Sequence, residues 1–203
     1  MLSLRGAALS DRLKNNSLRW LAVLAWIAVP TWAYADTLNA WQALKTPGAI
    51  VMFRHALAPG GGDPAGFVLG DCTTQRNLSP QGREQAARIG EVLRQTKVAV
   101  SAIWHSEWCR TRDTARLAFP DRAGQELRAK PAFNSFFGSP DSEPAQTAAA
   151  KSLLLGWRGS GVLVVVTHQV NITALTGIVP QSGEGVVLLQ ENGQLLLKGK
   201  LLP

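Results

Sequence analysis

Two short apolar segments, each followed within two residues by a histidine, constrain the fold of this chain more than any other feature. Residues 49–53 (AIVMF) precede Arg54 and His55, and residues 162–167 (VLVVVT) precede His168. Both segments are short, β-branched and without polar alternation, as is typical of strands buried on both faces of a parallel sheet. Functional side chains collect beyond the carboxyl ends of such strands, so this pattern suggests an anion site with an imidazole nucleophile. Taken alone, either segment could equally hold ordinary strand-end residues.

The first 35 residues have the pattern of a secretory signal peptide. Four basic residues precede the apolar segment 21–29, and Ala33-Tyr34-Ala35 matches the small-x-small cleavage pattern. The uncharged stretch 20–35 is short for a membrane span and contains Pro30. We therefore expect a signal peptide over residues 1–35 and an exported, periplasmic domain over residues 36–203 without a stable membrane span. Retention of the leader as an N-terminal anchor is the alternative.

Charge and cysteine content narrow the class of this domain. Residues 36–203 contain 17 basic and 13 acidic residues, a net charge of +4. Because no basic run or basic–aromatic alternation stands out, the expected partner is an anionic, phosphorylated molecule and not nucleic acid. Three histidines, and two cysteines without a C-x-x-C, leave few ligands for a metal, so we expect neither metal nor other cofactor. In an exported protein Cys72 and Cys109 could form a disulfide, or they could remain two separate thiols.

Strands and helices alternate along the domain. The pattern predicts strands at about 48–53, 98–104 and 162–167, and helices at about 80–95, 108–119, 144–157 and 171–175, with Ser79 and Ser142 as helix caps. Asn192-Gly193, between the apolar runs 185–190 and 194–198, predicts a β-hairpin. This order predicts a three-layer α/β domain with a mostly parallel sheet, helices on both faces and a C-terminal hairpin at the edge. The loops 57–78 and 131–143 are expected to form the walls of a pocket.

Four ordered segments resemble the motifs of the phosphoglycerate-mutase-like histidine phosphatase superfamily. They are Arg54-His55-Ala56, residues 77–86 (NLSPQGREQA), Ser106 followed by residues 110–115 (RTRDTA), and Thr167-His168. Two positions depart from the family pattern, because Ala56 stands where the family has glycine and Thr111 where it has alanine. The resemblance covers most of residues 36–203.

This resemblance implies a phosphomonoester hydrolase in which His55 attacks phosphorus and becomes a phosphohistidine. Arg54, Arg110 and His168 would surround the phosphoryl oxygens without a metal, with His55 neutral and His168 cationic. Arg76 lies where family members often place an added phosphate-binding arginine, although it could be a solvated loop charge, and the adjacent Asn77 is expected to contact substrate with it. A phosphomutase of the same fold and a non-catalytic phosphate-binding module are the alternatives. Exported branches of the family suggest a phosphorylated envelope sugar, such as lipopolysaccharide-core heptose phosphate, as substrate.

The proton donor is the residue that the sequence constrains least. Many family members place an acid in the segment after the middle motif, and others place one directly after the second histidine. Here residues 134–138 (NSFFG) contain no acid, and Gln169 follows His168. The remaining candidates are Asp63, Asp71, Asp141 and Glu143. We rank Asp63 first because its glycine-rich setting can fold over the site, whereas Asp141 and Glu143 could simply stabilise a helix N-terminus.

Overall fold

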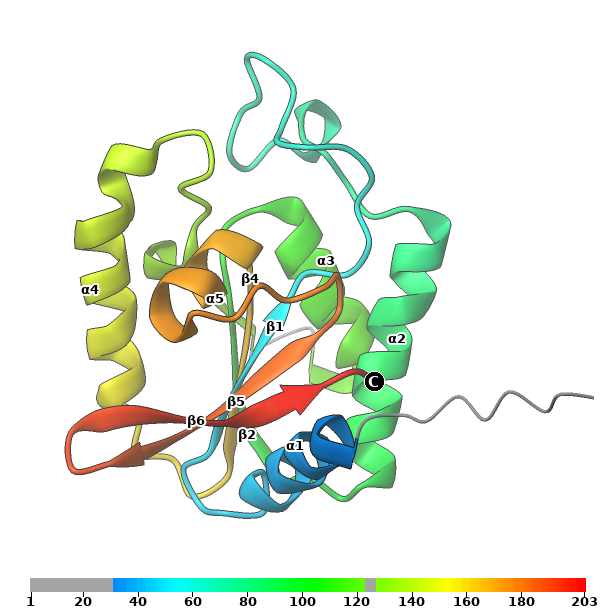
Figure 1. Cartoon of the computed structure of the whole chain (residues 1–203). Helices are drawn as coiled ribbons and strands as arrows, with labels where there is room; N and C mark the ends of the chain where they lie inside the picture. The colour runs from blue at the N-terminus through cyan, green and yellow to red at the C-terminus, as the bar shows by residue number, and fades with distance from the viewer. Residues whose placement is uncertain (1–30, 123–126) are drawn as a thin grey trace, which may run out of the picture.

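The computed structural model describes residues 31–122 and 127–203 (Figure 1). In this part of the chain six strands form one sheet in the order β3-β2-β4-β1-β5-β6. The strands are β1 Ile50–Arg54, β2 Val100–His105, β3 Leu127–Ala129, β4 Val162–Thr167, β5 Gly185–Glu191 and β6 Gln194–Leu201. The first four in the order run parallel, and β5 and β6 form an antiparallel hairpin at the edge. The predicted α/β fold is therefore confirmed.

Helices cover both faces of the sheet and complete the three layers. They are α1 Thr31–Ala43, α2 Pro80–Gln95, α3 Cys109–Ala118, α4 Glu143–Leu155 and α5 Gln169–Thr176. Helices α1, α2 and α3 share one buried cluster with Val51 and Val164, and α4 and α5 share another with Met52 and Val165. Figure 1 shows α4 and α2 on opposite sides of the sheet. Alternate residues of β1 and β4 thus face two apolar layers, which explains why neither segment contains polar positions.

Most predicted boundaries agree with the structure to within two residues. Ser79 caps α2 as expected, its hydroxyl accepting a hydrogen bond from the backbone N–H of Gly82 at 3.0 Å. Ser142 occupies the N-cap position of α4 as expected, but its side chain makes no capping hydrogen bond. This serine belongs to a 3-10 turn, Pro140–Ser142, that runs directly into α4, and its hydroxyl donates to the carbonyl oxygen of Ser139 at 2.8 Å. Strand β3 was not predicted, because three residues are too few to show a period.

The predicted signal peptide lies mostly outside the described residues. The description begins with α1, and the expected cleavage position after Ala35 falls within this helix. Its C-terminal part packs onto the sheet through the buried Ala40 and Ala43. Over residues 31–122 and 127–203, no helix combines the length and the apolar character needed to cross a membrane.

Candidate active site

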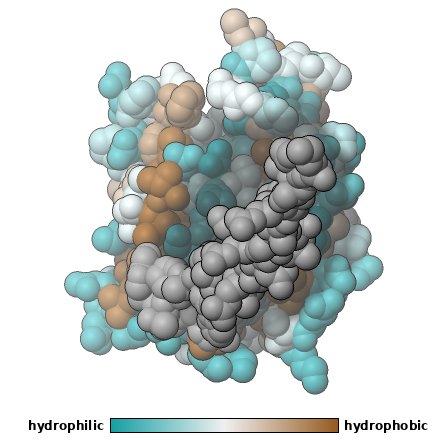
Figure 2. Space-filling model, turned by 45° about the vertical axis from the view of Figure 1, so that its right-hand side comes forward, coloured by the Kyte–Doolittle hydropathy of each residue, from teal (hydrophilic) through white to brown (hydrophobic). Residues whose placement is uncertain are grey.

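The carboxyl ends of β1 and β4 open into a pocket of about 710 Å³. Arg54 and Thr167 end these neighbouring strands in register, so His55 and His168 follow side by side, with ring centroids 5.5 Å apart. The expected loops supply the walls, with residues 60–67 and Arg76 on one side and residues 135–139 on the other. Figure 2 shows the molecule hollowed at its top, between two lobes.

His55 is held in the tautomer that a nucleophile needs. Its Nδ1 lies 2.8 Å from the carbonyl oxygen of Ala56. Because a carbonyl oxygen only accepts hydrogen bonds, Nδ1 carries the ring proton and Nε2 keeps its lone pair. Burial lowers the pKa of His55 to about 3, and the positive charges of Arg110, Arg76 and Arg54 act in the same direction. The imidazole is therefore neutral and nucleophilic at neutral pH.

His168 is oriented by a chain of hydroxyl groups that ends on the backbone. The guanidinium Nη2 of Arg110 lies 3.4 Å from His168 Nδ1 and can only donate, so the ring proton is on Nε2. Nε2 donates to Ser106 Oγ at 2.8 Å, and Ser106 Oγ lies 2.7 Å from Thr111 Oγ1. Thr111 in turn donates to the carbonyl oxygen of Trp108 at 2.8 Å. The departure of Thr111 from the family alanine thus closes a hydrogen-bond chain.

The structure does not show the expected charge separation between the two histidines. Burial lowers the pKa of His168 well below its ordinary value, and the positive charges of Arg110, Arg76 and Arg54 add to this effect. Both imidazoles are therefore neutral in this structure. A bound anion would supply the negative charge that His168 needs in order to become a cation.

Three arginines surround the histidines and make the pocket an anion site. Arg110 is 2% exposed and projects from the first turn of α3. Arg54 Nη1 donates to the carbonyl oxygen of Pro180 at 3.0 Å, and Arg76 Nη1 donates to the carbonyl oxygens of Ala58 and Gly60. The Nε atoms of all three arginines are buried and find no hydrogen-bond partner within the described residues. Such unsatisfied cationic donors suit a multiply charged oxyanion.

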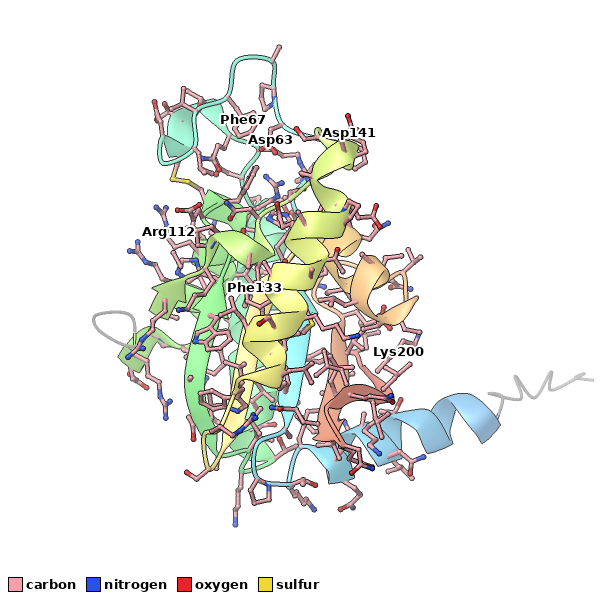
Figure 3. All side chains as sticks on the ribbon, turned by 90° about the vertical axis from the view of Figure 1, so that its left-hand side faces the viewer. Asp63, Phe67, Arg112, Phe133, Asp141 and Lys200 are labelled. Carbon is pink, nitrogen blue, oxygen red and sulfur yellow. A yellow bond between two sulfur atoms is a disulfide. The ribbon has the colours of Figure 1, made fainter. Side chains whose placement is uncertain are left out.

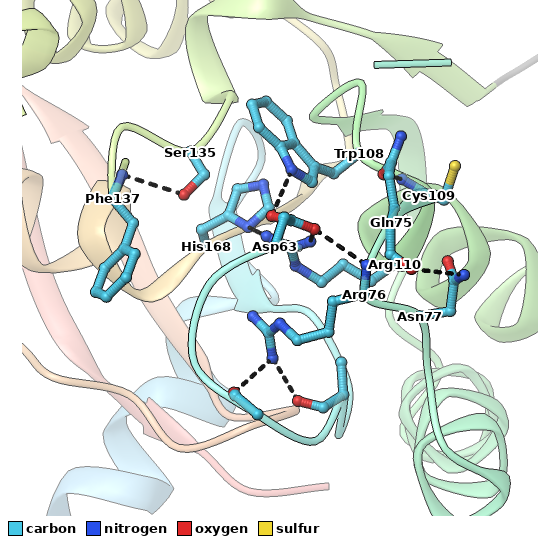
Figure 4. Close-up of polar contacts among 12 residues, drawn as sticks. Asp63, Gln75, Arg76, Asn77, Trp108, Cys109, Arg110, Ser135, Phe137 and His168 are labelled. Atoms are coloured by element: carbon cyan, nitrogen blue, oxygen red, sulfur yellow. Dashed lines mark hydrogen bonds and ion pairs between the residues drawn. The ribbon is translucent and has the colours of Figure 1, made fainter. Parts of the chain in front are cut away.

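Asp63 lies inside this site, bonded to Arg110 at 2.7 Å (Figure 4). Its other oxygen accepts a hydrogen bond from the indole Nε1 of Trp108 at 3.0 Å, and the backbone N–H of Arg76 donates at 3.1 Å. Burial acts to raise the pKa of the Asp63 carboxyl, but the hydrogen bond and charge of Arg110 outweigh it and lower the pKa below its usual value. The residue that we ranked first as proton donor is therefore an ionised carboxylate in this state.

The other candidate acids lie away from the pocket. Of the described residues that line it, only Asp63 carries a carboxylate. Asp71 is exposed and accepts hydrogen bonds from the backbone and hydroxyl of Thr73, at 3.0 and 2.7 Å. Asp141 and Glu143 are exposed at the start of α4, outside the pocket lining.

Asn77 is not brought to the pocket either. Its side-chain amide donates to the carbonyl oxygens of Cys72 at 2.6 Å and Gln75 at 3.0 Å. The neighbouring Arg76 does line the pocket, with its guanidinium held against the glycine-rich segment of the same loop. The substrate contact expected for Asn77 is thus replaced by a role in shaping the loop.

Cys72 and Cys109 form a disulfide with their Cα atoms 5.7 Å apart (Figure 3). Cys109 is the first residue of α3 and immediately precedes Arg110. Gln75 strengthens this junction, because its Oε1 accepts a hydrogen bond from the backbone N–H of Cys109 at 3.0 Å. The disulfide therefore fastens the loop 57–78 to the helix end that carries the buried arginine.

Aromatic side chains also line the pocket, and no sequence pattern predicted them. Trp108 packs edge-on against His168, with ring centroids 5.3 Å apart, and Phe67 tilts against Trp108 at 5.7 Å. Phe137 on the opposite loop is 63% exposed and reaches toward Gly62. Figure 3 shows Phe67 and Asp63 close together on the loop at the top of the molecule. This part of the pocket wall is thus largely aromatic.

Metal-ligating residues do not cluster in the described parts of the chain. No group of three or more histidine, cysteine, aspartate or glutamate side chains there could hold a metal ion.

A neutral imidazole among three arginines, at the strand ends of an α/β sheet, defines the class of protein: an α/β domain with a site suited to an oxyanion. The family model of the histidine phosphatase superfamily (branch 1) matches residues 50–152, and the chain belongs to this superfamily. The matched segment includes Arg54, His55 and Arg110, while His168 lies beyond it. A comparison with curated protein sequences gives no match.

Solved structures support the same fold. The protein histidine phosphatase SixA, complexed with tungstate, superposes with a TM-score of 0.53 at 17% identity over 76% of this chain and 97% of that one. A mycobacterial glucosyl-3-phosphoglycerate phosphatase, complexed with VO3, gives 0.53 at 18% identity over 73% and 96%. A phosphoserine phosphatase mutant from Entamoeba histolytica, in complex with phosphoserine, gives 0.55 at 14% identity over 75% and 95%. At these identities the likeness establishes the fold, not the substrate.

Proposed function

We propose that this protein is a phosphomonoester hydrolase that works through a phosphohistidine on His55. The observation that carries the proposal is the hydrogen bond from His55 Nδ1 to the carbonyl oxygen of Ala56, which leaves the Nε2 lone pair free beside three arginines. Phosphoryl transfer needs mainly positioning and charge stabilisation, and a buried cluster of guanidinium groups supplies both.

The proposed reaction has two steps. Nε2 of His55 attacks phosphorus, the bond to the leaving oxygen breaks, and a proton is delivered to that oxygen. Water then attacks the phosphohistidine and releases inorganic phosphate. Arg54, Arg110 and His168 hold the phosphoryl oxygens throughout, and Asp63 is the proposed proton donor. The proposal requires no metal, because the arginines carry the charge stabilisation.

The test is a trapping experiment with a generic aryl phosphate. Brief exposure to substrate should leave an acid-labile, base-stable phosphoprotein, and His55→Ala should abolish both this species and phosphate release. Addition of a metal chelator should leave the rate unchanged. Near-normal turnover by His55→Ala would contradict the mechanism, and loss of activity with chelator would contradict metal independence.

Two alternative functions are separated by the same assay. A phosphomutase would return the phosphoryl group to an acceptor sugar phosphate and release little inorganic phosphate. A non-catalytic phosphate-binding module would form no phosphoprotein at all. The neutral, correctly oriented His55 favours a working enzyme over a module that has lost its chemistry.

We further propose that the protein is exported and acts in the periplasm on a phosphorylated envelope sugar such as heptose phosphate. The basic leader, the apolar segment and the Ala33-Tyr34-Ala35 pattern support export. Mass spectrometry of the protein from a secreting host should give an N-terminus at Asp36. The substrate proposal is tested by a panel of phosphorylated sugars, nucleotides and aryl phosphates. A full-length N-terminus, or poor rates with every sugar phosphate, would contradict the respective proposal.

A further inference from the structure

The carboxylate of Asp63 occupies the position that an anionic ligand of Arg110 would need. Three donors hold it, namely the guanidinium of Arg110 on α3, the indole of Trp108 just before α3, and the backbone N–H of Arg76 in the same loop as Asp63 (Figure 4). The side chain of Asp63 is 8% exposed and that of Arg110 is 2% exposed. This is a complete, buried ion pair in the middle of the phosphoryl site.

Arg110 cannot serve Asp63 and a phosphoryl group fully at the same time. Its Nη1 is bonded to Asp63 at 2.7 Å, and its Nη2 lies 3.4 Å from His168 Nδ1. A bidentate grip on phosphoryl oxygens uses two N–H groups of one guanidinium edge. As long as Asp63 stays in place, a phosphoryl group can use only Nε and Nη2 of Arg110, and it must displace the carboxylate to reach Nη1.

The segment that carries Asp63 is built so that it can move aside. Gly60 and Gly62 have φ values of +94° and +81°, a region that glycine enters without steric cost. Gly61, between them, has no neighbouring atoms within 4 Å of the place where a Cβ would lie. The disulfide fastens the same loop at Cys72, nine residues beyond Asp63, so the Asp63 end can shift while the loop stays attached.

We propose, on the basis of the phosphatase function above, that Asp63 and the substrate's phosphoryl group occupy Arg110 in turn. The carboxylate holds Nη1 of Arg110 in this structure, and the phosphoryl group displaces it. The displaced carboxyl then takes a proton from solvent and delivers it to the leaving oxygen.

Electrostatics makes the displaced carboxyl an acid. In this structure Asp63 has Arg110 as ion-pair partner, with Arg54, Arg76, His55 and His168 around the same pocket. Once the phosphoryl group has taken Arg110, Asp63 has lost its cation and faces a dianion. Both changes disfavour the ionised form of Asp63, so its carboxyl group can hold a proton and donate it as a general acid.

The proton balance closes over one turnover. Asp63 gains one proton on displacement and gives it to the leaving oxygen as His55 Nε2 bonds to phosphorus. The resulting carboxylate accepts a proton from the water that hydrolyses the phosphohistidine. When phosphate leaves, Asp63 releases that proton to solvent and returns to Arg110.

Calorimetric binding of inorganic phosphate tests the exchange without turnover. Asp63→Asn removes the competing charge, so we expect phosphate to bind at least ~10-fold more tightly than to the wild type. Titration in two buffers of different ionisation enthalpy should show that the variant takes up about one proton fewer per phosphate bound than the wild type, because the variant has no carboxyl to protonate. Asp71→Asn, an exposed acid of the same loop, is the matched control and should change neither quantity.

Asp63→Asn should hydrolyse alkyl phosphates at least ~10²-fold more slowly than the wild type. The rate with aryl phosphates should fall much less, because aryl leaving groups need little protonation. If Asp63 only oriented Arg110, its replacement would not both tighten phosphate binding and slow the hydrolysis of alkyl phosphates. Unchanged or weaker phosphate binding by both Asp63→Asn and Asp63→Ala, or an unchanged proton uptake, would overturn the proposal. Retained turnover in His55→Ala with tighter phosphate binding in Asp63→Asn would overturn the proposed function and leave the exchange standing.

Discussion

At the scale of residues, hydrogen bonds that end on backbone carbonyl oxygens fix the tautomer of His55 and the orientation of His168. The carbonyl oxygen of Ala56 fixes the tautomer of His55, and the carbonyl oxygen of Trp108 ends the hydroxyl chain that orients His168. Because a carbonyl oxygen can only accept a hydrogen bond, each ring has one defined protonation pattern in this structure. The donors that remain free for a ligand are then largely those of the arginines.

Arg110→Ala is expected to reduce kcat by on the order of 10²-fold or more. Arg110 is the most deeply buried of the three arginines and would face the negative charge that develops in the transition state. Arg116→Ala, on the exposed last turn of the same helix, is the control and should retain kcat. Steady-state kinetics with an aryl phosphate measures both. Equal rates for the two variants would show that Arg110 does not touch the reacting group.

At the scale of elements, two loops form the walls of the pocket at the carboxyl ends of β1 and β4. The loop 57–78 is fastened at Cys72 and capped onto α2 at Ser79, and the loop 131–143 faces it with Phe137. The loops carry Phe67 and Phe137, whereas the strand ends carry Arg54 and the two histidines. Substrate selectivity should therefore change with the loops and reactivity with the strand ends.

Phe137→Ala should raise KM for phenyl phosphate about 5-fold and leave KM for a small alkyl phosphate unchanged. An aromatic contact of this kind contributes about 1 kcal/mol to binding. Val179→Ala is the control, because Val179 and Phe137 are each 63% exposed and Val179 is not part of the pocket lining. An equal rise in KM for both substrates would mean that Phe137 shapes the loop and does not contact the leaving group.

The double substitution Cys72→Ser with Cys109→Ser should lower the free energy of unfolding by as much as about 4 kcal/mol, the loop-entropy value for a closure of this size. It should also raise KM, because the loop bearing Asp63 and Arg76 is no longer held against α3. Denaturant unfolding and steady-state kinetics measure the two effects. Non-reduced peptide mapping is the control, and two alkylated free thiols in the untreated protein would contradict the prediction.

For the whole molecule, the buried neutral histidine couples stability to pH. The pKa of His55 is about 3 in the folded protein, whereas a histidine in an unfolded chain titrates near 6.5. Between these values the unfolded chain binds a proton that the folded one does not. The free energy of unfolding therefore falls as the pH falls below 6.5, and His168, whose pKa is also lowered, acts in the same direction.

We expect His55 to contribute a slope of about 1.4 kcal/mol per pH unit well below pH 6.5. Denaturant unfolding at pH 7.5, 5.5 and 4.5 measures it, with His55→Ala as the comparison. The variant should lose stability with falling pH less steeply than the wild type by about this amount. Parallel pH profiles for the two proteins would show that His55 is protonated in the folded state.

The sequence alone determined the layers of the fold and the chemical groups at the sheet edge. Segments 49–53 and 162–167 specify buried strands because their local composition fits no other element of that length, and His55 and His168 follow them by covalent connection. The helix cap at Ser79 and the hairpin turn at Asn192-Gly193 are likewise local. Tertiary structure alone decided which polar groups meet. How two loops pack over α3 decides that Asp63 pairs with Arg110 and that Asn77 points away from the site. The same packing forms the aromatic wall of Trp108, Phe67 and Phe137. Such contacts join residues far apart in the chain, and local propensity carries no information about them.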